Sequence, residues 1–177
     1  MINFRYVKFK NFLSTGNVLT EIKLDRSPNT LVIGENGAGK STMLDALCFS
    51  LFGKAFRKIK KPQLMNSVNM KDCLVEVGFQ IGSIDYKIIR GLKPHKFEIY
   101  VNNKMIDQTA SVRDYQEHLE KNIIKLNFTS FTQIVILGSS TFVPFMQLPA
   151  NQRREIIEDL LDIKIFTAMN ILLKEKV

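Results

Sequence analysis

Residues 34–42 constrain the fold of this chain more than any other segment. They read Gly-Glu-Asn-Gly-Ala-Gly-Lys-Ser-Thr, which fits the pattern G-x-x-x-x-G-K-[ST] at every specified position. The apolar run at 30–33 predicts a buried strand before them. The run at 40–52, apolar on nearly all sides and closed by Gly53, predicts a buried helix after them. A strand, a glycine-rich turn and a helix in this order predict an α/β fold built around a phosphate-binding loop.

The chemistry expected of this loop is the binding of a nucleoside triphosphate, ATP, together with Mg²⁺. Glycines let the backbone curl so that its N–H groups surround an anion, and the helix that follows adds its positive dipole end. Lys40 would reach the β- and γ-phosphates, as the one candidate for contact with the transition state, and Ser41 would coordinate Mg²⁺. The residues expected around the nucleotide are Gly34, Asn36, Gly37, Ala38, Gly39, Lys40, Ser41 and Thr42. The alternative is a glycine-rich turn that merely precedes a helix, and the pattern arises by chance roughly once in a hundred chains of this length.

Hydrolysis needs further groups that the sequence does not supply in the usual place. An acidic residue that holds Mg²⁺ usually ends a second apolar strand. The second apolar run, 133–137, is predicted to be a buried strand but continues into Gly138, and Glu158 and Asp159 fall inside a helical pattern. We therefore expect ATP binding on this chain and no catalytic residue beyond Lys40.

The rest of the chain predicts a mixed sheet with helices. Alternating polar and apolar residues at 2–9 and 18–24 predict half-exposed strands, and the alternation between 73 and 101 predicts an antiparallel meander. Apolar residues three and four apart at 111–126 predict an amphipathic helix that packs on the sheet, and a similar pattern runs from 151 to the last residue. We expect a lobe at 1–150 and the start of a long helix at 151–177.

Composition restricts the class of protein and its partners. The formal net charge of +8 and the pI near 9.5 suit a polyanionic partner such as DNA. No stretch approaches the ~20 apolar residues of a membrane span, and the N-terminus lacks the pattern of a secretory signal. Cys48 and Cys73 fit no metal spacing and are expected to be buried thiols. These features predict a cytoplasmic protein without a membrane partner.

Several segments together resemble a known family. The stretches are Phe9-Lys-Asn-Phe-Leu-Ser14, residues 31–47 and Leu51-Phe-Gly53, and they resemble the opening of SMC-type ABC ATPases. The resemblance is strongest to the Rad-fifty/SbcC family of double-strand-break-processing nuclease complexes. Residues 131–146 and 151–161 are similar to the part where that family passes through its Q-loop into its first coiled-coil helix. The sequences of residues 54–67 and 133–145 are most similar to ATPase subunits of the recombination endonucleases of T-even-like bacteriophages. For such a subunit the location would be the host cytoplasm.

The resemblance implies that this chain is the N-terminal lobe of a split ATPase head, with residues 151–177 as the start of its coiled coil. The implied partners are a C-terminal lobe of the same ATPase, a second head in a homodimer, a nuclease subunit of the SbcD-like metallophosphoesterase type, and DNA. Two positions depart from the family pattern. Leu13 stands where the family usually has an Arg near the phosphates, and Ser139 aligns with the Q-loop Gln that senses Mg²⁺, while Gln133 lies six residues earlier.

Other interpretations remain open from the sequence. A basic cluster follows the loop helix and is a candidate for DNA phosphates: Lys54, Arg57, Lys58, Lys60 and Lys61. Residues 58–60 could instead border the adenine. The chain could also be a free-standing kinase of a small molecule, with Arg153 and Arg154 as phosphate clamps, or an architectural DNA-binding module that keeps ATP without hydrolysing it.

Overall fold

Alternation of apolar and polar residues gives the chain a six-stranded sheet in the computed structural model, which describes residues 2–106, 111–137, 143–161 and 163–174. The strand order is β2-β1-β3-β4-β5-β6 and every pairing is antiparallel. The bounds are β1 (Ile2–Lys10), β2 (Thr20–Lys23), β3 (Cys73–Ile81), β4 (Ile84–Leu92), β5 (Lys96–Val101) and β6 (Lys104–Met105). The predicted meander is therefore confirmed.

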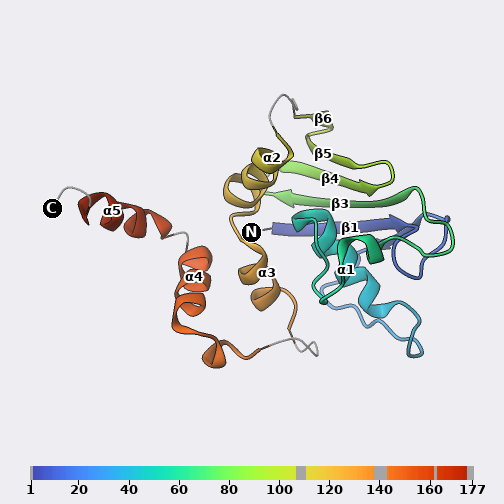
Figure 1. Ribbon diagram of the computed structural model, residues 1–177, viewed down its shortest axis with the longest axis horizontal. Helices are drawn as coiled ribbons and strands as arrows, with labels where there is room; N and C mark the ends of the chain where they lie inside the picture. Colours follow the sequence, from blue (N-terminus) through green and yellow to red (C-terminus); the bar gives the residue numbers. More distant parts are fainter. Residues whose placement is uncertain (1, 107–110, 138–142, 162, 175–177) are drawn as a thin grey trace. The chain divides into compact units, whose positions relative to one another are not determined.

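One face of this sheet carries the core of the first unit. Val7, Val77, Ile88 and Ile99 are cross-strand neighbours on β1, β3, β4 and β5, and all four are 0% exposed. Helix α1 (Lys40–Phe52) packs against β1, β3 and β4 (Figure 1). The helix buries most of its length and ends at Gly53, whose φ of 71° allows the left-handed cap. The predicted buried helix is confirmed.

The predicted strand at 30–33 does not form. Among the described residues this segment pairs with no strand, and its side chains face solvent, with Leu31 82% and Ile33 84% exposed. A strand needs a neighbour that accepts and donates its backbone hydrogen bonds. The described sheet offers none here, so the expected mixed sheet is an antiparallel one.

The turns and the next helix follow the prediction more closely. Asn102 and Asn103, with φ of 48° and 64°, make the tight turn between β5 and β6. The helical segment predicted at 111–126 consists of α2 (Val112–His118) and a π-helical stretch (Leu119–Ile124). The Gln116 side chain donates to the Leu51 carbonyl and accepts from Arg90 of β4. This end of α2 is thus tied to the sheet and to α1.

The chain divides into two compact units, Met1–Gln116 and Glu117–Val177. The second unit contains α3 (Phe128–Ile134), α4 (Ala150–Leu161), α5 (Lys164–Lys174) and a 3₁₀ turn (Phe145–Gln147). A second 3₁₀ turn, Lys61–Leu64, belongs to the first unit. The division falls earlier than residue 150, and the assignment of 1–150 to a head lobe and 151–177 to a coiled coil stays a prediction.

The strand predicted at 133–137 is wrong, because residues 133 and 134 end helix α3 and residues 135–137 form a turn and an irregular segment. The Asn127 side chain accepts the Ser130 N–H at 2.9 Å and so caps the first turn of α3. Phe131 is fully buried, and the helix continues to Ile134. The helix cap outweighs the apolar run, which by itself could not distinguish a strand from a helix.

The helical pattern predicted from 151 onward is interrupted at Ile163. Its N–H bonds the Glu158 carbonyl at 3.0 Å, which is one residue wider than an α-helical bond, and its carbonyl accepts from Phe166 at the start of α5. The Thr167 hydroxyl donates to the Glu158 carboxylate across the interruption. Helices α4 and α5 are therefore separate elements.

Both cysteines are buried and free. Burial raises the pKa of Cys48 to about 12 and that of Cys73 to about 11, so the prediction of buried thiols is confirmed. In the part of the chain that the structure describes, none of the helices has the length and apolar character needed to cross a membrane.

Gly78 on β3 gives a test of this fold. A Cβ at this position would overlap the ring of Tyr6, which lies against the glycine, and the Tyr6 hydroxyl donates to Glu76 at 2.8 Å. We expect Gly78→Ala to lower the free energy of unfolding by about 1–3 kcal/mol, measured by urea denaturation. The double variant Tyr6→Ala/Gly78→Ala should lose less than the sum of the single variants. A Gly78→Ala protein with unchanged stability would contradict this packing.

Candidate nucleotide site

The loop at 34–42 has the backbone conformation that its glycines predict. Gly37 and Gly39 have φ of 91° and 90°, a region that L side chains rarely adopt, and nothing lies within 4 Å of the position of a Cβ on Gly37. Gly39 caps α1, and its carbonyl accepts the Thr42 N–H at 2.9 Å. The first turn of a buried helix thus begins inside a glycine-rich loop, which is the arrangement that favours an anion.

Lys40 folds back across this loop. Its ammonium group donates to the carbonyl oxygens of Gly34 at 2.6 Å and Glu35 at 2.7 Å. Neutral carbonyls are weaker partners for an ammonium than phosphate oxygens. The side chain is therefore held at the loop by bonds that an anion can replace.

A cavity of about 560 Å³ opens beside the loop. Three segments of the first unit form its walls: the loop and the start of α1, the connection after β1, and the segment after α1. The lining residues are Leu13, Ser14, Asn36, Gly37, Gly39, Lys40, Ser41, Thr42, Arg57, Ile59, Gln63, Met65 and Ser67. The cavity is large enough for a small-molecule ligand, and six of the eight residues predicted around a nucleotide border it.

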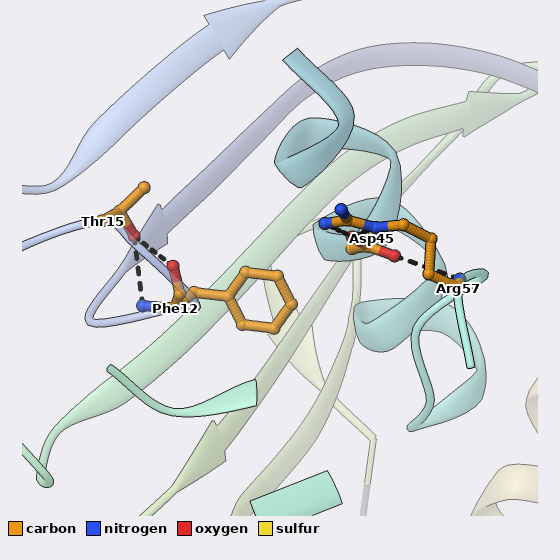
Figure 2. A network of polar contacts seen from close by, with 4 residues as sticks. All are labelled: Phe12, Thr15, Asp45 and Arg57. Carbon is orange, nitrogen blue, oxygen red and sulfur yellow. Dashed lines mark hydrogen bonds and ion pairs between the residues drawn. The ribbon is translucent and has the colours of Figure 1, made fainter. Parts of the chain in front are cut away.

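The connection after β1 is fixed by Phe12. This side chain is 0% exposed, and its ring centroid lies 5.5 Å from that of Phe49 on α1. The Phe12 backbone donates to the Thr15 hydroxyl, which in turn donates to the Phe12 carbonyl (Figure 2). Leu13 donates its N–H to the Leu64 carbonyl at 2.7 Å. Leu13 is thus held at the cavity wall, where it supplies an apolar surface.

The buried Asp45 and the partly exposed Arg57 form an ion pair (Figure 2). The Arg57 Nε donates to the Asp45 Oδ2 at 2.6 Å, its Nη2 pairs with the same oxygen, and its backbone N–H donates to Oδ1 at 3.3 Å. The Asp45 side chain is 0% exposed and that of Arg57 is 38% exposed. The carboxylate on α1 therefore fixes the chain that follows the helix and holds Arg57 at the cavity wall.

The basic cluster predicted as a DNA-binding group divides into two sets. Arg57 lines the cavity together with its neighbour Ile59, which is not part of the cluster, whereas Lys54, Lys58, Lys60 and Lys61 are exposed. Arg57 is thus a wall residue of the cavity rather than a member of an exposed patch. The position of Ile59 agrees with the alternative that residues 58–60 border a base.

Of the other positions discussed from the sequence, Gln133, Arg153 and His118 lie in the second unit and His95 lies in the first. Gln133 is in α3 rather than in a strand, and Ser139 lies outside the described residues, so its assignment to the Q-loop stays a prediction. Arg153 donates to the Met146 carbonyl at 3.0 Å. His95 and His118 are exposed.

Sequence reasoning missed the contribution of the segment 61–67. Gln63, Met65 and Ser67 border the cavity, and no motif marks them. One feature of the sequence could have indicated a role for Asp45, because it is the one acidic residue within the apolar helix 40–52. A charge that must be buried needs a partner, but the sequence does not say that the partner is Arg57.

Comparison with known proteins agrees with this site. A family model described as an AAA domain matches residues 6–176. The chain belongs to the AAA domain family. Membership implies that the chain binds a nucleotide, and the match spans the phosphate loop and both compact units.

Individual relatives confirm the resemblance found in the sequence. The chain is 44% identical over 171 residues to "Exonuclease subunit 2" of Escherichia phage RB69, a match that covers 97% of this chain and 30% of that protein. It is 30% identical over 162 residues to "DNA double-strand break repair Rad50 ATPase" of Thermoplasma acidophilum, covering 89% of this chain and 18% of that protein. The chain thus spans about a third or less of the length of these relatives.

A solved structure confirms the fold. The Smc head domain from Pyrococcus furiosus, with an extended coiled coil and bound to the C-terminal domain of ScpA, matches with a TM-score of 0.67 at 20% identity. The match covers 99% of this chain and 46% of that one. The fold is therefore that of the N-terminal part of an SMC-type ATPase head.

The Asp45–Arg57 pair can be tested by stability measurements. Arg57→Ala leaves a buried carboxylate without its cation, and we expect it to lower the free energy of unfolding by about 3–5 kcal/mol. Asp45→Asn/Arg57→Ala should recover part of this loss, since the uncompensated charge is gone. The matched control is Lys58→Ala on the neighbouring exposed residue, which should change stability by less than about 0.5 kcal/mol. Equal effects of Arg57→Ala and Lys58→Ala would contradict the role of the pair.

Proposed function

We propose that this chain is the ATP-binding N-terminal lobe of a DNA double-strand-break repair and recombination ATPase. In this proposal two heads dimerise on ATP and regulate an associated nuclease at DNA ends. The observation that carries the proposal is the phosphate loop at the wall of a cavity of about 560 Å³, with Lys40 and Arg57 as its cations. The names of the phage and archaeal relatives support the biological setting.

The residues present suit ATP with Mg²⁺. Ser41 is exposed and lines the cavity next to Lys40. Its hydroxyl would hold the metal ion, which when bound neutralises charge on the phosphates. Lys40 would exchange its two carbonyl partners for phosphate oxygens. Arg57, kept in place by Asp45, would add a second positive charge. Ile59 and Leu13 provide apolar surface for the base or ribose.

A C-terminal lobe is the first proposed partner, because an apolar segment next to the loop is largely exposed in the described part of the chain. Leu31, Val32 and Ile33 are 82%, 48% and 84% exposed. Unpaired apolar segments of this kind are templates for pairing with another strand. We propose that a strand of the C-terminal lobe pairs with residues 30–33 and brings the acidic groups needed for hydrolysis.

The other partners follow from the helices and the charge. On α5, Ile165, Met169 and Leu172 are four and three residues apart and are 65%, 52% and 58% exposed. This spacing suits a coiled-coil seam with the C-terminal half of the protein, and the same helix would receive a nuclease subunit of the SbcD-like metallophosphoesterase type. The net charge of +8 suits DNA. We place this assembly in the cytoplasm, that of the host for a phage protein.

Lys40→Ala tests ATP binding. Loss of a charge-assisted hydrogen bond is worth about 1.5–3 kcal/mol, so we expect the variant to bind a fluorescent ATP analogue with Mg²⁺ at least about tenfold more weakly. Lys104→Ala, which removes an exposed lysine that does not line this cavity, should bind as the unchanged chain does. The alternative, a free-standing small-molecule kinase, predicts a different result. In that case ATP turnover would need a small-molecule acceptor, and neither DNA nor the C-terminal lobe would alter its rate.

The proposed pairing at residues 30–33 can be tested separately. Leu31→Asp/Ile33→Asp should prevent co-purification with a co-expressed C-terminal lobe, because charges would enter the new interface. The lone chain should keep its stability within about 0.5 kcal/mol, since both side chains are already exposed. Val18→Asp is the matched control, because Val18 is 82% exposed and lies elsewhere in the chain. Retention of the lobe by the double variant would contradict the pairing.

A further inference from the structure

A second cavity, of about 480 Å³, lies in the first unit on the other side of the segment that follows α1. It is bordered by that segment and by the turn after β4. The lining residues are Lys61, Pro62, Met65, Met70, Leu92, Lys93 and His95. None of them belongs to the phosphate loop, and Met65 is the residue that lines both cavities.

The walls of this cavity are held by backbone hydrogen bonds. Met65 forms a β-bridge with Phe12. The Met70 N–H donates to the Asn66 carbonyl at 3.0 Å, and the Asp72 N–H donates to the Lys93 carbonyl at 2.8 Å. The segment 65–72 is therefore joined to the connection after β1 on one side and to the turn after β4 on the other. A preformed cavity needs little rearrangement to accept a ligand.

Two residues that line this cavity have an unfavourable backbone conformation. Met70 and Lys93 have φ of 50° and 47°, although neither is a glycine. Such conformations cost about 1–3 kcal/mol each, and they gather at ligand clamps and other functional positions. The conformations of Met70 and Lys93 therefore support a ligand-binding role for this cavity.

The lining has a chemistry suited to a planar apolar group that carries negative charge beside it. Pro62, Met65, Met70 and Leu92 supply apolar surface, and the cations Lys61 and Lys93 stand at its edge with His95. Thioether sulfurs make favourable contacts with aromatic rings, and His rings stack on exposed bases. Lysines pair with phosphates without regard to sequence. A nucleobase with its flanking phosphates meets all three requirements.

We propose that this cavity receives an unstacked base of single-stranded DNA, with the neighbouring phosphates on Lys61 and Lys93. This inference rests on the proposed function and names the form of DNA that the lobe grips. An acidic peptide with an apolar anchor is the competing occupant. The absence of acidic residues from the described lining and the +8 charge of the chain both favour the nucleic acid, as does the flexible methionine surface that can accept any base.

The test compares two oligonucleotides with equal phosphate charge. One is an oligothymidylate of about 15 nucleotides and the other is an abasic strand of the same length, both followed by fluorescence anisotropy. We expect the oligothymidylate to bind about tenfold more tightly, since stacking of one base accounts for a factor of this order. Equal affinities for the two strands would overturn the proposal.

Two variants locate the effect. Met70→Ala should abolish the preference for the oligothymidylate and leave abasic binding unchanged. Val68→Ala is the matched control, because Val68 is 87% exposed on the same loop and does not line the cavity. Lys93→Gln should weaken binding of both strands and reduce the slope of affinity against salt by about one ion. A preference that survives in Met70→Ala would overturn the assignment to this cavity.

The remaining readouts separate this inference from the proposed function. Binding of the fluorescent ATP analogue should be the same in Met70→Ala and in the unchanged chain. If the unchanged chain binds ATP but shows no preference for the oligothymidylate, the proposed DNA-binding cavity is wrong and the proposed ATPase lobe is unaffected. A leucine-containing acidic peptide is the second probe. If it binds the unchanged chain but not Met70→Ala, and Met70→Ala still prefers the oligothymidylate, the cavity belongs to a protein partner instead.

Discussion

Burial of α1 against the sheet is the constraint on which the rest of the molecule depends. The helix rests on β1, β3 and β4, next to the fully buried row of Val7, Val77, Ile88 and Ile99. Because its first residue is Lys40, the position of the phosphate loop is set by the packing of the hydrophobic core. A helix terminus that cannot shift gives an anion site whose backbone donors are already in place. The stability of the fold and the geometry of the loop thus come from the same contacts.

The sequence predicted those parts of the structure that depend on neighbouring residues. The phosphate loop, α1 with its Gly53 cap and the β3–β5 meander all follow from spacing and turn chemistry, and each is observed. The prediction of a strand at 30–33 was wrong because a strand needs a neighbouring strand, and local composition does not show whether one is present. The prediction of a strand at 133–137 was wrong for another reason. Their apolar run fits a strand or a helix equally, and the Asn127 cap that decides between them lies six residues earlier.

The candidate site was predicted only in part for the same physical reason. Six residues of the predicted loop border the cavity, but its other walls come from the connection after β1 and from the segment after α1. The Asp45–Arg57 pair joins residues twelve positions apart, and no periodicity indicates that a guanidinium turns inward there. In the cluster 54–61, charge alone suggested one exposed surface. Alternation of inward and outward side chains in an irregular segment separates Arg57 from the exposed lysines around it.

Met65 gives the two cavities a common wall, and its backbone is held by the bridge to Phe12. A movement of Met65 that enlarges one cavity therefore changes the volume of the other. If each compartment has a ligand, thermodynamic linkage requires the effect to be mutual and equal in size. Through Met65, a nucleotide would then change the affinity for a DNA base by the same factor as the base changes the affinity for the nucleotide.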